Sequence, residues 1–118
     1  DYAKMRMQFG RPIASFQSMK HKQADMLVDV ELAKASAYYA AAALDAGDAE
    51  LLAIASLAKA NSSEAYMQTA IHAVQVRGGI GFTWDDDTHL WFKRAKSSEI
   101  FLGDAAHHRE VMMQQMAS

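Results

Sequence analysis

The chain has 118 residues, of which 51% are hydrophobic and 22% are charged, so it holds enough apolar material for the core of one globular domain. A formal net charge of -2 and a pI near 6.2 give no electrostatic reason to expect nucleic acid binding. The chain contains no cysteine, which excludes disulfide and thiolate chemistry, and no apolar run approaches the roughly 20 residues of a membrane-spanning helix.

The first long helix is predicted after a break near the N-terminus. Residues 1–8 have the composition of the last turns of a helix, which Gly10 and Pro12 should end, and a new helix can begin near Pro12 because proline has no amide hydrogen to lose. Apolar side chains then recur at steps of three and four residues until Gly47 ends the pattern. The stripe consists of Phe16, Met19, Met26, Val30, Ala33, Ala37, Ala41 and Leu44, with Gln23 at an intervening step.

A second long helix is predicted between Asp48, a plausible N-cap, and Gly78. Its apolar face consists of Leu51, Ile54, Leu57, Ala58, Ala65, Met67, Ala70, Ile71 and Val74. Each of the two helices should have about 30 residues and a length of roughly 45 Å. Because the turn between them is very short, they must lie antiparallel.

The rest of the chain predicts two shorter helices. An aspartate-rich turn precedes an apolar patch at residues 90–95, Gly103 interrupts the pattern, and Asp104 can cap a last helix that includes residues 111–116. No stretch alternates apolar and polar residues as a strand would. The sequence therefore predicts an all-α fold, an up-and-down helical bundle that forms a single domain over residues 1–118.

The second long helix ends in an unusual way, at residues 75–82 with the sequence QVRGGIGF. Gly78 and Gly79 can adopt positive φ and let a ligand or another backbone approach closely, and the amide of Gln75 can both donate and accept. Glycine after a helix is more often a simple C-cap, so this segment alone leaves a structural and a binding interpretation open.

A second segment, residues 6–17 with the sequence RMQFGRPIASFQ, gives the glycine-rich segment its context. Together the two segments resemble the C-terminal helical domain of the acyl-CoA dehydrogenase family, in which an Arg, a Phe-Gly pair and a Gln precede a distant Gln-x-x-Gly-Gly-x-Gly-aromatic motif. The resemblance runs along essentially the whole chain. It agrees with the helical bundle that the periodicity predicts.

The resemblance implies that both motifs hold the adenosine diphosphate half of FAD across a subunit interface. The residues that it assigns to FAD are Arg6, Phe9, Gln17, Gln75, Gly78 and Gly79. The chemistry agrees, because a forked arginine donor and free backbone amides suit a diphosphate. An arginine at a helix end can also simply complement the helix dipole, and Phe16 is better interpreted as a core residue.

Helical bundles can also hold metals, and a di-iron site needs two inward-facing Glu-x-x-His pairs. None of the five glutamates is followed by histidine three residues later. His107, His108 and Glu110 lie close in sequence, but adjacent positions on a helix point to different sides, so we interpret them as a solvated helix start. The sequence predicts no metal site, and His72 is better interpreted as a surface or packed side chain than as a base.

The resembled family removes two hydrogens from an acyl-CoA thioester. A carboxylate takes the α proton as the β hydride passes to the flavin, and hydrogen bonds to the thioester carbonyl stabilise the developing enolate. That base commonly lies in a Tyr-Glu-Gly-Thr segment before the last helix. The aligned stretch here is residues 101–104, with the sequence FLGD, so Leu102 occupies the glutamate position. Leucine cannot accept a proton, but its backbone N–H can still donate to the thioester carbonyl.

Three explanations for Leu102 stay open. The base can lie on the helix that precedes the first motif, which would be upstream of Asp1, or on a partner subunit of a mixed oligomer. Asp104 is the third candidate and the weakest, because its side chain is expected to cap a helix.

The sequence thus predicts a C-terminal fragment of a longer FAD-dependent flavoprotein that acts on acyl-CoA. The implied partners are the missing N-terminal and middle domains and further subunits of a homo- or hetero-oligomer, in the bacterial cytoplasm or, in a eukaryote, the mitochondrial matrix. The start without Met agrees with a fragment, and the isolated bundle should be inactive because it lacks the rest of the flavin pocket. The alternatives are a catalytically silent subunit or oligomerisation module, and a related flavin oxidase or monooxygenase.

Overall fold

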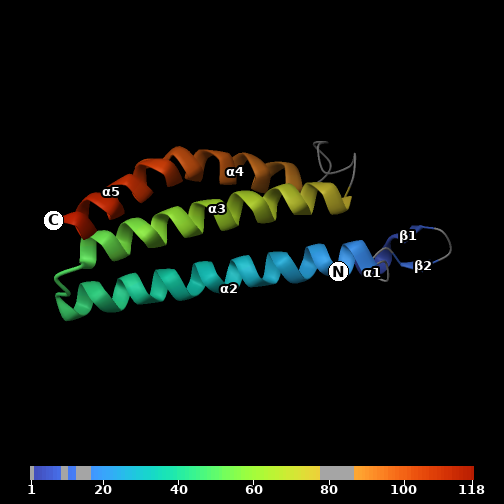
Figure 1. Cartoon of the computed structure of the whole chain (residues 1–118). Coiled ribbons are helices and arrows are strands. Elements are labelled where there is room, and N and C mark those ends of the chain that lie inside the picture. The colour runs from blue at the N-terminus through green and yellow to red at the C-terminus, as the bar shows by residue number, and fades with distance from the viewer. Residues whose placement is uncertain (1, 9–10, 13–16, 78–86) are drawn as a thin grey trace.

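A computed structural model describes residues 2–8, 11–12, 17–77 and 87–118 of the chain. Its elements, in chain order, are α1 (Tyr2–Met5), β1 (Met7–Gln8), β2 (Arg11–Pro12), α2 (Gln17–Ala46), α3 (Leu51–Arg77), α4 (Thr88–Ile100) and α5 (Ala105–Ala117). The all-α prediction is confirmed, with one small antiparallel pair of two-residue strands added near the N-terminus (Figure 1).

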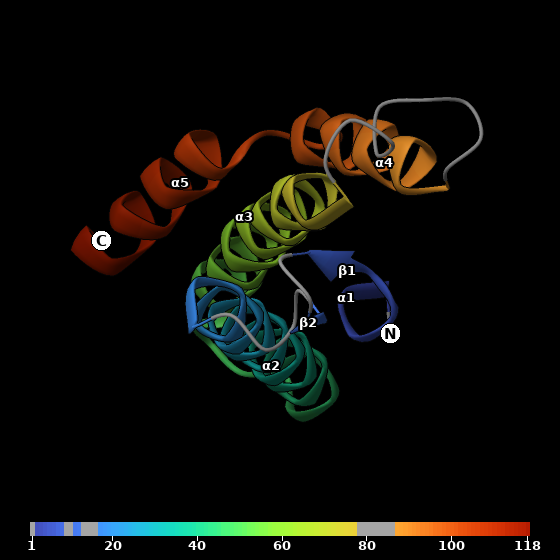
Figure 2. The same ribbon diagram turned by 90° about the vertical axis from the view of Figure 1, so that its right-hand side faces the viewer.

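Helix α3 is the central element of the fold. It lies antiparallel to α2 on one side and contacts α4 and α5 on the other, so the long helices form layers (Figures 1 and 2). The molecule is elongated, with extents of 58 × 26 × 23 Å. Most of the described core also belongs to α3, whose buried residues are Ile54, Ser56, Ala58, Ala60, Ser63, Ala70 and Val74.

The ends of α2 and α3 follow the capping signals. Gly47 has φ of +65°, its amide donates to the Leu44 carbonyl at 3.1 Å, and the Asp48 amide donates to the Ala43 carbonyl at 2.9 Å. These two bonds form a Schellman motif, for which glycine is the natural residue. The Asp48 carboxylate then accepts the Glu50 amide at 2.7 Å, so the predicted sharp turn and its cap are confirmed.

The apolar stripe of α2 was predicted correctly only in its first half. Met19, Met26, Val30 and Ala33 are half-buried, but Ala37, Ala41 and Leu44 are exposed. In the second half of α2, the inward positions are instead Ser36, Ala40 and Ala43. Two successive four-residue steps rotate a stripe by about 40° each, because a helix has 3.6 residues per turn. The predicted stripe therefore turns away from the inner face of α2 in its second half.

The N-terminal segment also differs from the prediction. Helix α1 ends at Met5 rather than near residue 8, and Pro12 itself lies in β2. Helix α2 is described from Gln17 onward, and residues 13–16, where the predicted start falls, lie outside the described residues. Between them β1 and β2 pair, with Met7 opposite Pro12 and Gln8 opposite Arg11. Proline has a fixed φ and no N–H, which suits an edge strand as well as a helix start.

Several large apolar side chains of α2 are exposed among the described residues. Leu27, Leu32, Tyr38 and Tyr39 have exposed fractions of 61%, 60%, 75% and 58%. Large exposed apolar patches on a soluble domain usually mark a contact surface. The exposed apolar side chains of α2 therefore mark a candidate contact surface.

The link between α4 and α5 is a tight turn formed by residues 100–103, here called the 100–103 turn. The Gly103 amide donates to the Ile100 carbonyl at 3.2 Å, Phe101 has φ of −65° and ψ of 127°, and Leu102 has φ of +62°. These values are those of a type II turn, whose third position normally holds glycine or asparagine. Leu102 therefore has a strained backbone conformation. Its side chain is 73% exposed, so burial of that side chain does not offset the strain.

We expect Leu102→Gly to raise the free energy of unfolding of the chain by about 0.5–1 kcal/mol, because relief of the left-handed strain outweighs the greater backbone entropy of glycine. Urea denaturation measures the change. The matched control is Leu32→Gly, an equally exposed leucine inside α2, which should lower the free energy of unfolding by about 1 kcal/mol. A loss of stability in Leu102→Gly would contradict the turn assignment.

An ion pair joins α3 to α5 and should make stability depend on pH. The Arg109 guanidinium donates to both carboxylate oxygens of Glu64, at 2.5 and 2.6 Å, and this hydrogen bonding holds the pKa of Glu64 below its ordinary value. Because the pKa of Glu64 is lower in the folded state, the pair stabilises the fold fully above the unfolded pKa near 4.3, and that contribution is lost as the pH falls through the folded value.

Glu64→Gln should therefore reduce the difference between the Tm at pH 7 and the Tm at pH 3, as measured by circular dichroism. The effect should be modest, because both side chains are about half exposed. Glu31→Gln serves as the control, since Glu31 bonds only Lys34 on its own helix at 3.3 Å. An unaltered pH profile in Glu64→Gln would show that the ion pair contributes nothing to stability.

Candidate functional site

The predicted FAD residues that the structure describes lie at one end of the molecule. Gln17 is the first residue of α2, Gln75 lies in the last turn of α3, and Arg6 joins α1 to β1. Because α2 and α3 are antiparallel, the start of one lies beside the end of the other, next to the small strand pair (Figure 1). All three side chains are exposed. Phe9, Gly78 and Gly79 lie outside the described residues, as does Phe16.

Gln75 is oriented by a lysine that the sequence analysis did not single out. The Lys22 ammonium donates to Gln75 Oε1 at 2.7 Å and links α2 to α3. Because an ammonium has no acceptor, the carbonyl oxygen of Gln75 must face Lys22, and its NH₂ group points elsewhere as a donor. Lys22 is half-buried on the inner face of α2, so a lysine within an apolar stripe was the available signal.

A second group of residues surrounds the 100–103 turn. The half-buried Lys59 of α3 donates to Ser63 Oγ at 2.7 Å, the Ser98 carbonyl at 3.1 Å and the Gly103 carbonyl at 3.2 Å. His108 Nε2 lies 2.7 Å from the Leu102 carbonyl oxygen. The conformation of this turn is therefore fixed from both α3 and α5.

Asp104 has the role of a helix cap. Its Oδ1 accepts the His107 amide at 2.8 Å, and its backbone is extended, as expected for an N-cap. The predicted cap of the last helix is confirmed. This geometry directs the carboxylate to the start of α5 and leaves it poorly suited to act as a base beside Leu102.

The backbone amide of Leu102 is available to a ligand. Within a type II turn this N–H belongs to the central peptide, which the turn's own hydrogen bond does not use. Among the described residues, no acceptor bonds it. A backbone N–H held in a fixed turn is a suitable donor for a carbonyl oxygen that gains negative charge during a reaction.

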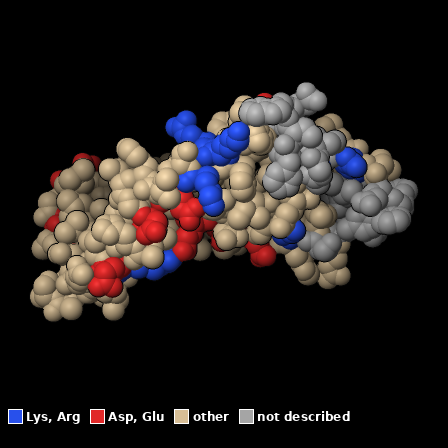
Figure 3. All heavy atoms as spheres, turned by 90° about the horizontal axis from the view of Figure 1, so that it is seen from above, with Lys and Arg blue, Asp and Glu red and all other residues tan. Residues whose placement is uncertain are grey.

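The two groups lie far apart along α3. Gln75 and Lys59 are separated by 16 residues of one helix, which corresponds to roughly 24 Å. Beside the turn, Lys59, Ser62, Tyr66, Arg94 and Phe101 help to line a hollow of about 430 Å³. Helix α4 carries Lys93, Arg94 and Lys96 as exposed side chains, and basic side chains gather near the middle of the α4 and α5 face (Figure 3).

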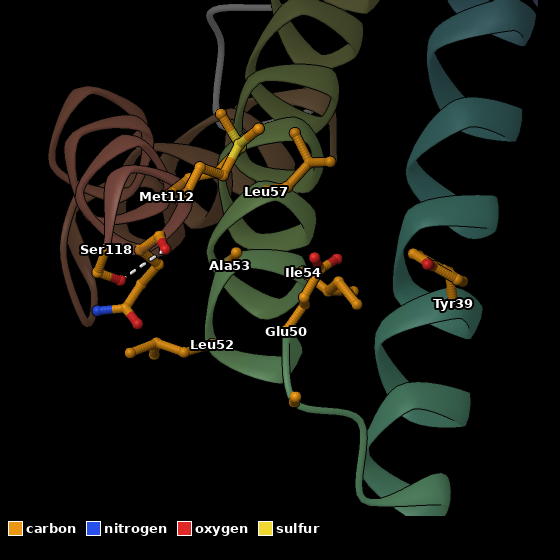
Figure 4. Close-up of a pocket in the computed structure, with 11 residues that line it drawn as sticks. Tyr39, Glu50, Leu52, Ala53, Ile54, Leu57, Met112 and Ser118 are labelled. Carbon is orange, nitrogen blue, oxygen red and sulfur yellow. Dashed lines mark hydrogen bonds between the residues drawn. The ribbon is translucent and has the colours of Figure 1, made fainter.

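Another hollow, of about 500 Å³, lies at the opposite end of the molecule from the strand pair. Tyr39 of α2, Leu52 and Leu57 of α3 and Met112 of α5 face it, with Glu50 as its charged member (Figure 4). None of the predicted site residues lines it. It is therefore separate from both groups described above.

Within the part of the chain that the structure describes, no group of three or more metal-binding side chains converges. His107 and His108 contact each other edge to face, with ring centroids 5.1 Å apart, rather than pointing at a common centre. In the same residues, no helix is both long enough and apolar enough to cross a membrane.

Comparison with known proteins gives a consistent result. Residues 1–117 match the family described as acyl-CoA dehydrogenase, C-terminal domain. The acyl-CoA dehydrogenase IpdE2 of Mycobacterium tuberculosis is 44% identical over 98 residues, which cover 83% of this chain and 29% of the relative.

Solved structures agree with the sequence comparison. Butyryl-CoA dehydrogenase from Megasphaera elsdenii superposes with a TM-score of 0.92 and 31% identity, over 99% of this chain and 30% of that protein. An FAD-dependent dehydrogenase gives a TM-score of 0.90 at 31% identity, over 98% of this chain and 31% of its own length. The chain thus spans about 30% of the length of these proteins. The chain belongs to the acyl-CoA dehydrogenase family and corresponds to its C-terminal domain.

Proposed function

We propose that this chain is the C-terminal domain of an FAD-dependent acyl-CoA dehydrogenase, in which it braces FAD and forms a subunit interface. The observation that supports the proposal is that Arg6, Gln17 and Gln75, from three separate segments, lie at the same end of the bundle with exposed side chains. They come from the two motifs that the family match joins in one domain. The complete protein then includes N-terminal and middle domains, and acts in the cytoplasm if it is bacterial.

The donor set at that end suits the diphosphate of FAD. Arg6 supplies a cationic fork, and Gln75 presents its NH₂ group because Lys22 occupies its oxygen. Gly78 and Gly79 would add backbone amides without side chains in the way. When bound, FAD accepts the hydride of the reaction. The residues of this chain bind and orient it, while the rest of its pocket belongs to other domains and a neighbouring subunit.

The 100–103 turn serves the acyl-CoA substrate. The Leu102 amide donates to the thioester carbonyl oxygen and so stabilises the enolate that forms when the α proton leaves. Leu102 cannot take that proton, and Asp104 is engaged as a cap. The base therefore comes from outside this chain, on a preceding helix or on a partner subunit.

Assembly accounts for the uncovered apolar surface. The exposed leucines and tyrosines of α2 would be buried against other domains or subunits. Because the chain covers about 30% of its relatives, ample protein remains to cover them. An isolated domain of this kind lacks most of the flavin pocket and would be inactive.

The second candidate function is a catalytically silent subunit of a mixed acyl-CoA dehydrogenase. Leu102 at the position of the usual glutamate favours it, because the domain then retains its flavin motifs and its carbonyl donor without a base of its own. In that arrangement the domain contributes assembly and FAD bracing, and a partner subunit contributes the base.

In the intact flavoprotein, Arg6→Ala should weaken FAD binding about 10- to 100-fold by removing a charge-assisted hydrogen bond. Gly79→Val should also lower the FAD content, because a branched side chain blocks the approach of the backbone. The flavin absorbance of the purified proteins measures both effects. Lys34→Ala is the control, since Lys34 lies in the middle of α2 and bonds Glu31. Full FAD content in both variants would refute the assignment.

If the base is a glutamate on the helix that precedes the first motif, we expect the homo-oligomer to lose its flavin absorbance rapidly when an acyl-CoA is added without oxygen. Replacing such a glutamate by glutamine should abolish this bleaching, whereas Leu102→Ala should retain much of it. Asp104→Asn should leave it intact, because asparagine caps a helix as well as aspartate does. Bleaching that requires a partner subunit would favour the silent-subunit function. Loss of bleaching in Asp104→Asn would identify Asp104 as the base.

A further inference from the structure

The proposed function gives no role to Lys59, which lies beside the 100–103 turn. It is a half-buried lysine whose three ammonium hydrogens find three acceptors, on Ser63, Ser98 and Gly103. Two of these acceptors are backbone carbonyls that lie 39 and 44 residues away in sequence. Lys59 thus ties the central helix α3 to the region in which α4 ends and α5 begins.

What Lys59 can stabilise depends on where the Ser98 and Gly103 carbonyls lie in the chain. The Ser98 carbonyl belongs to the last turn of α4, where carbonyl groups have no hydrogen-bond partner within the helix. That turn has no basic side chain of its own, so the Lys59 ammonium supplies the positive charge that favours a helix C-terminus. The Gly103 carbonyl lies at the far end of the 100–103 turn. One ammonium therefore bonds α4 just before the turn and the last residue of the turn. On the α5 side, His108 holds the Leu102 carbonyl between them.

The turn needs this support because Leu102 disfavours it. With leucine in the third position, a type I turn at negative φ would be less strained than the observed type II turn. Exchange between the two types rotates the central peptide by about 150–170°. That rotation would send the Leu102 N–H to the opposite side of the turn. The direction of this amide thus depends on what holds the turn.

An anion site is the competing interpretation of Lys59, because Arg94 and several serines line the same hollow. The hydrogen bonds oppose it. All three ammonium hydrogens of Lys59 already point to acceptors of the protein, so a phosphate would have to displace the contacts that hold α4 and the turn. The geometry favours an internal clamp.

We propose that Lys59 is a positioning residue that keeps the 100–103 turn in its type II form and so aims the Leu102 amide at the thioester carbonyl. The inference rests on the proposed function for its substrate. Its geometric part, the clamp, stands independently of the reaction. Lys59 itself touches neither substrate nor flavin in this account.

The clamp is tested on this chain by amide hydrogen exchange of the segment that contains residues 99–104. Lys59→Met, which keeps the length of the side chain but removes its donors, should speed exchange there about 10-fold or more. Arg109→Gln is the matched control, because it breaks another tie between α3 and the outer layer without touching the turn. Equal exchange of this segment in Lys59→Met and the wild type would overturn the clamp.

The aim of the amide is tested in the intact flavoprotein by anaerobic flavin reduction with an acyl-CoA. Lys59→Met should lower the rate of reduction about 10- to 100-fold, with KM and FAD content nearly unchanged. This is less than the roughly 100- to 1,000-fold loss expected when an oriented donor is removed, because the Leu102 amide remains but is misdirected. Adding Leu102→Gly should restore much of the rate, because glycine adopts the type II turn without strain. A general loss of packing in Lys59→Met would instead lower the FAD content and raise KM, which the positioning role leaves nearly unchanged.

The two levels of the inference fail in different ways. If the wild-type protein does not reduce its flavin with any acyl-CoA, with or without a partner subunit, then the proposed function falls, while the exchange experiment still decides the clamp. If the wild type is active and Lys59→Met slows reduction no more than Arg109→Gln does, then the positioning role is wrong.

Discussion

Helix α3 must pack on two opposite sides, and the rest of the structure depends on how it does so. Its buried positions are held by small residues, among them Ser56, Ala58, Ala60, Ser63 and Ala70, so that α2 on one side and α4 and α5 on the other can approach closely. Little of α2, α4 or α5 is fully buried in return. The central helix is thus the only one with a core on both faces among the described residues, and the outer helices keep apolar surface for contacts beyond this chain.

The position of α3 also explains why two distant groups belong to one domain. A straight helix of 27 residues is a rigid spacer of roughly 40 Å. Its C-terminal end carries Gln75 beside the start of α2, and Lys59 lies nearer its N-terminal end, beside the 100–103 turn. Residues at two such positions on one rigid helix keep a fixed separation. Under the proposed function, these two positions serve the cofactor and the substrate.

How much the sequence could predict depended on the distance over which each signal acts. Gly47, Asp48 and Asp104 were predicted correctly because caps depend on bonds to residues only a few positions away. The helices were predicted from the periodicity of apolar residues, and the antiparallel packing of α2 and α3 from the short turn between them. The prediction for the second half of the α2 stripe was wrong, because alanines lie on both faces of that helix and so do not show which face points inward. Lys22 is marked in the sequence only as a lysine within an apolar stripe. The acceptors of Lys22 and Lys59 could not be predicted, because Gln75, Ser98 and Gly103 lie 53, 39 and 44 residues away.

The 100–103 turn shows why a side chain and a backbone respond differently to the same substitution. A glutamate replaced by leucine loses its proton acceptor completely, and no environment can restore it. The N–H of the same residue survives, because every residue except proline has one. Its usefulness, however, depends on its direction, and Leu102 makes the required turn harder to hold. Under the proposed function, the absence of a base at residue 102 and the need for anchors outside the turn therefore arise at one position. The anchors that hold the turn, Lys59 on α3 and His108 on α5, lie outside it. Under the proposed function, the direction of the remaining donor is thus set by α3 and α5 and not by the turn that carries it.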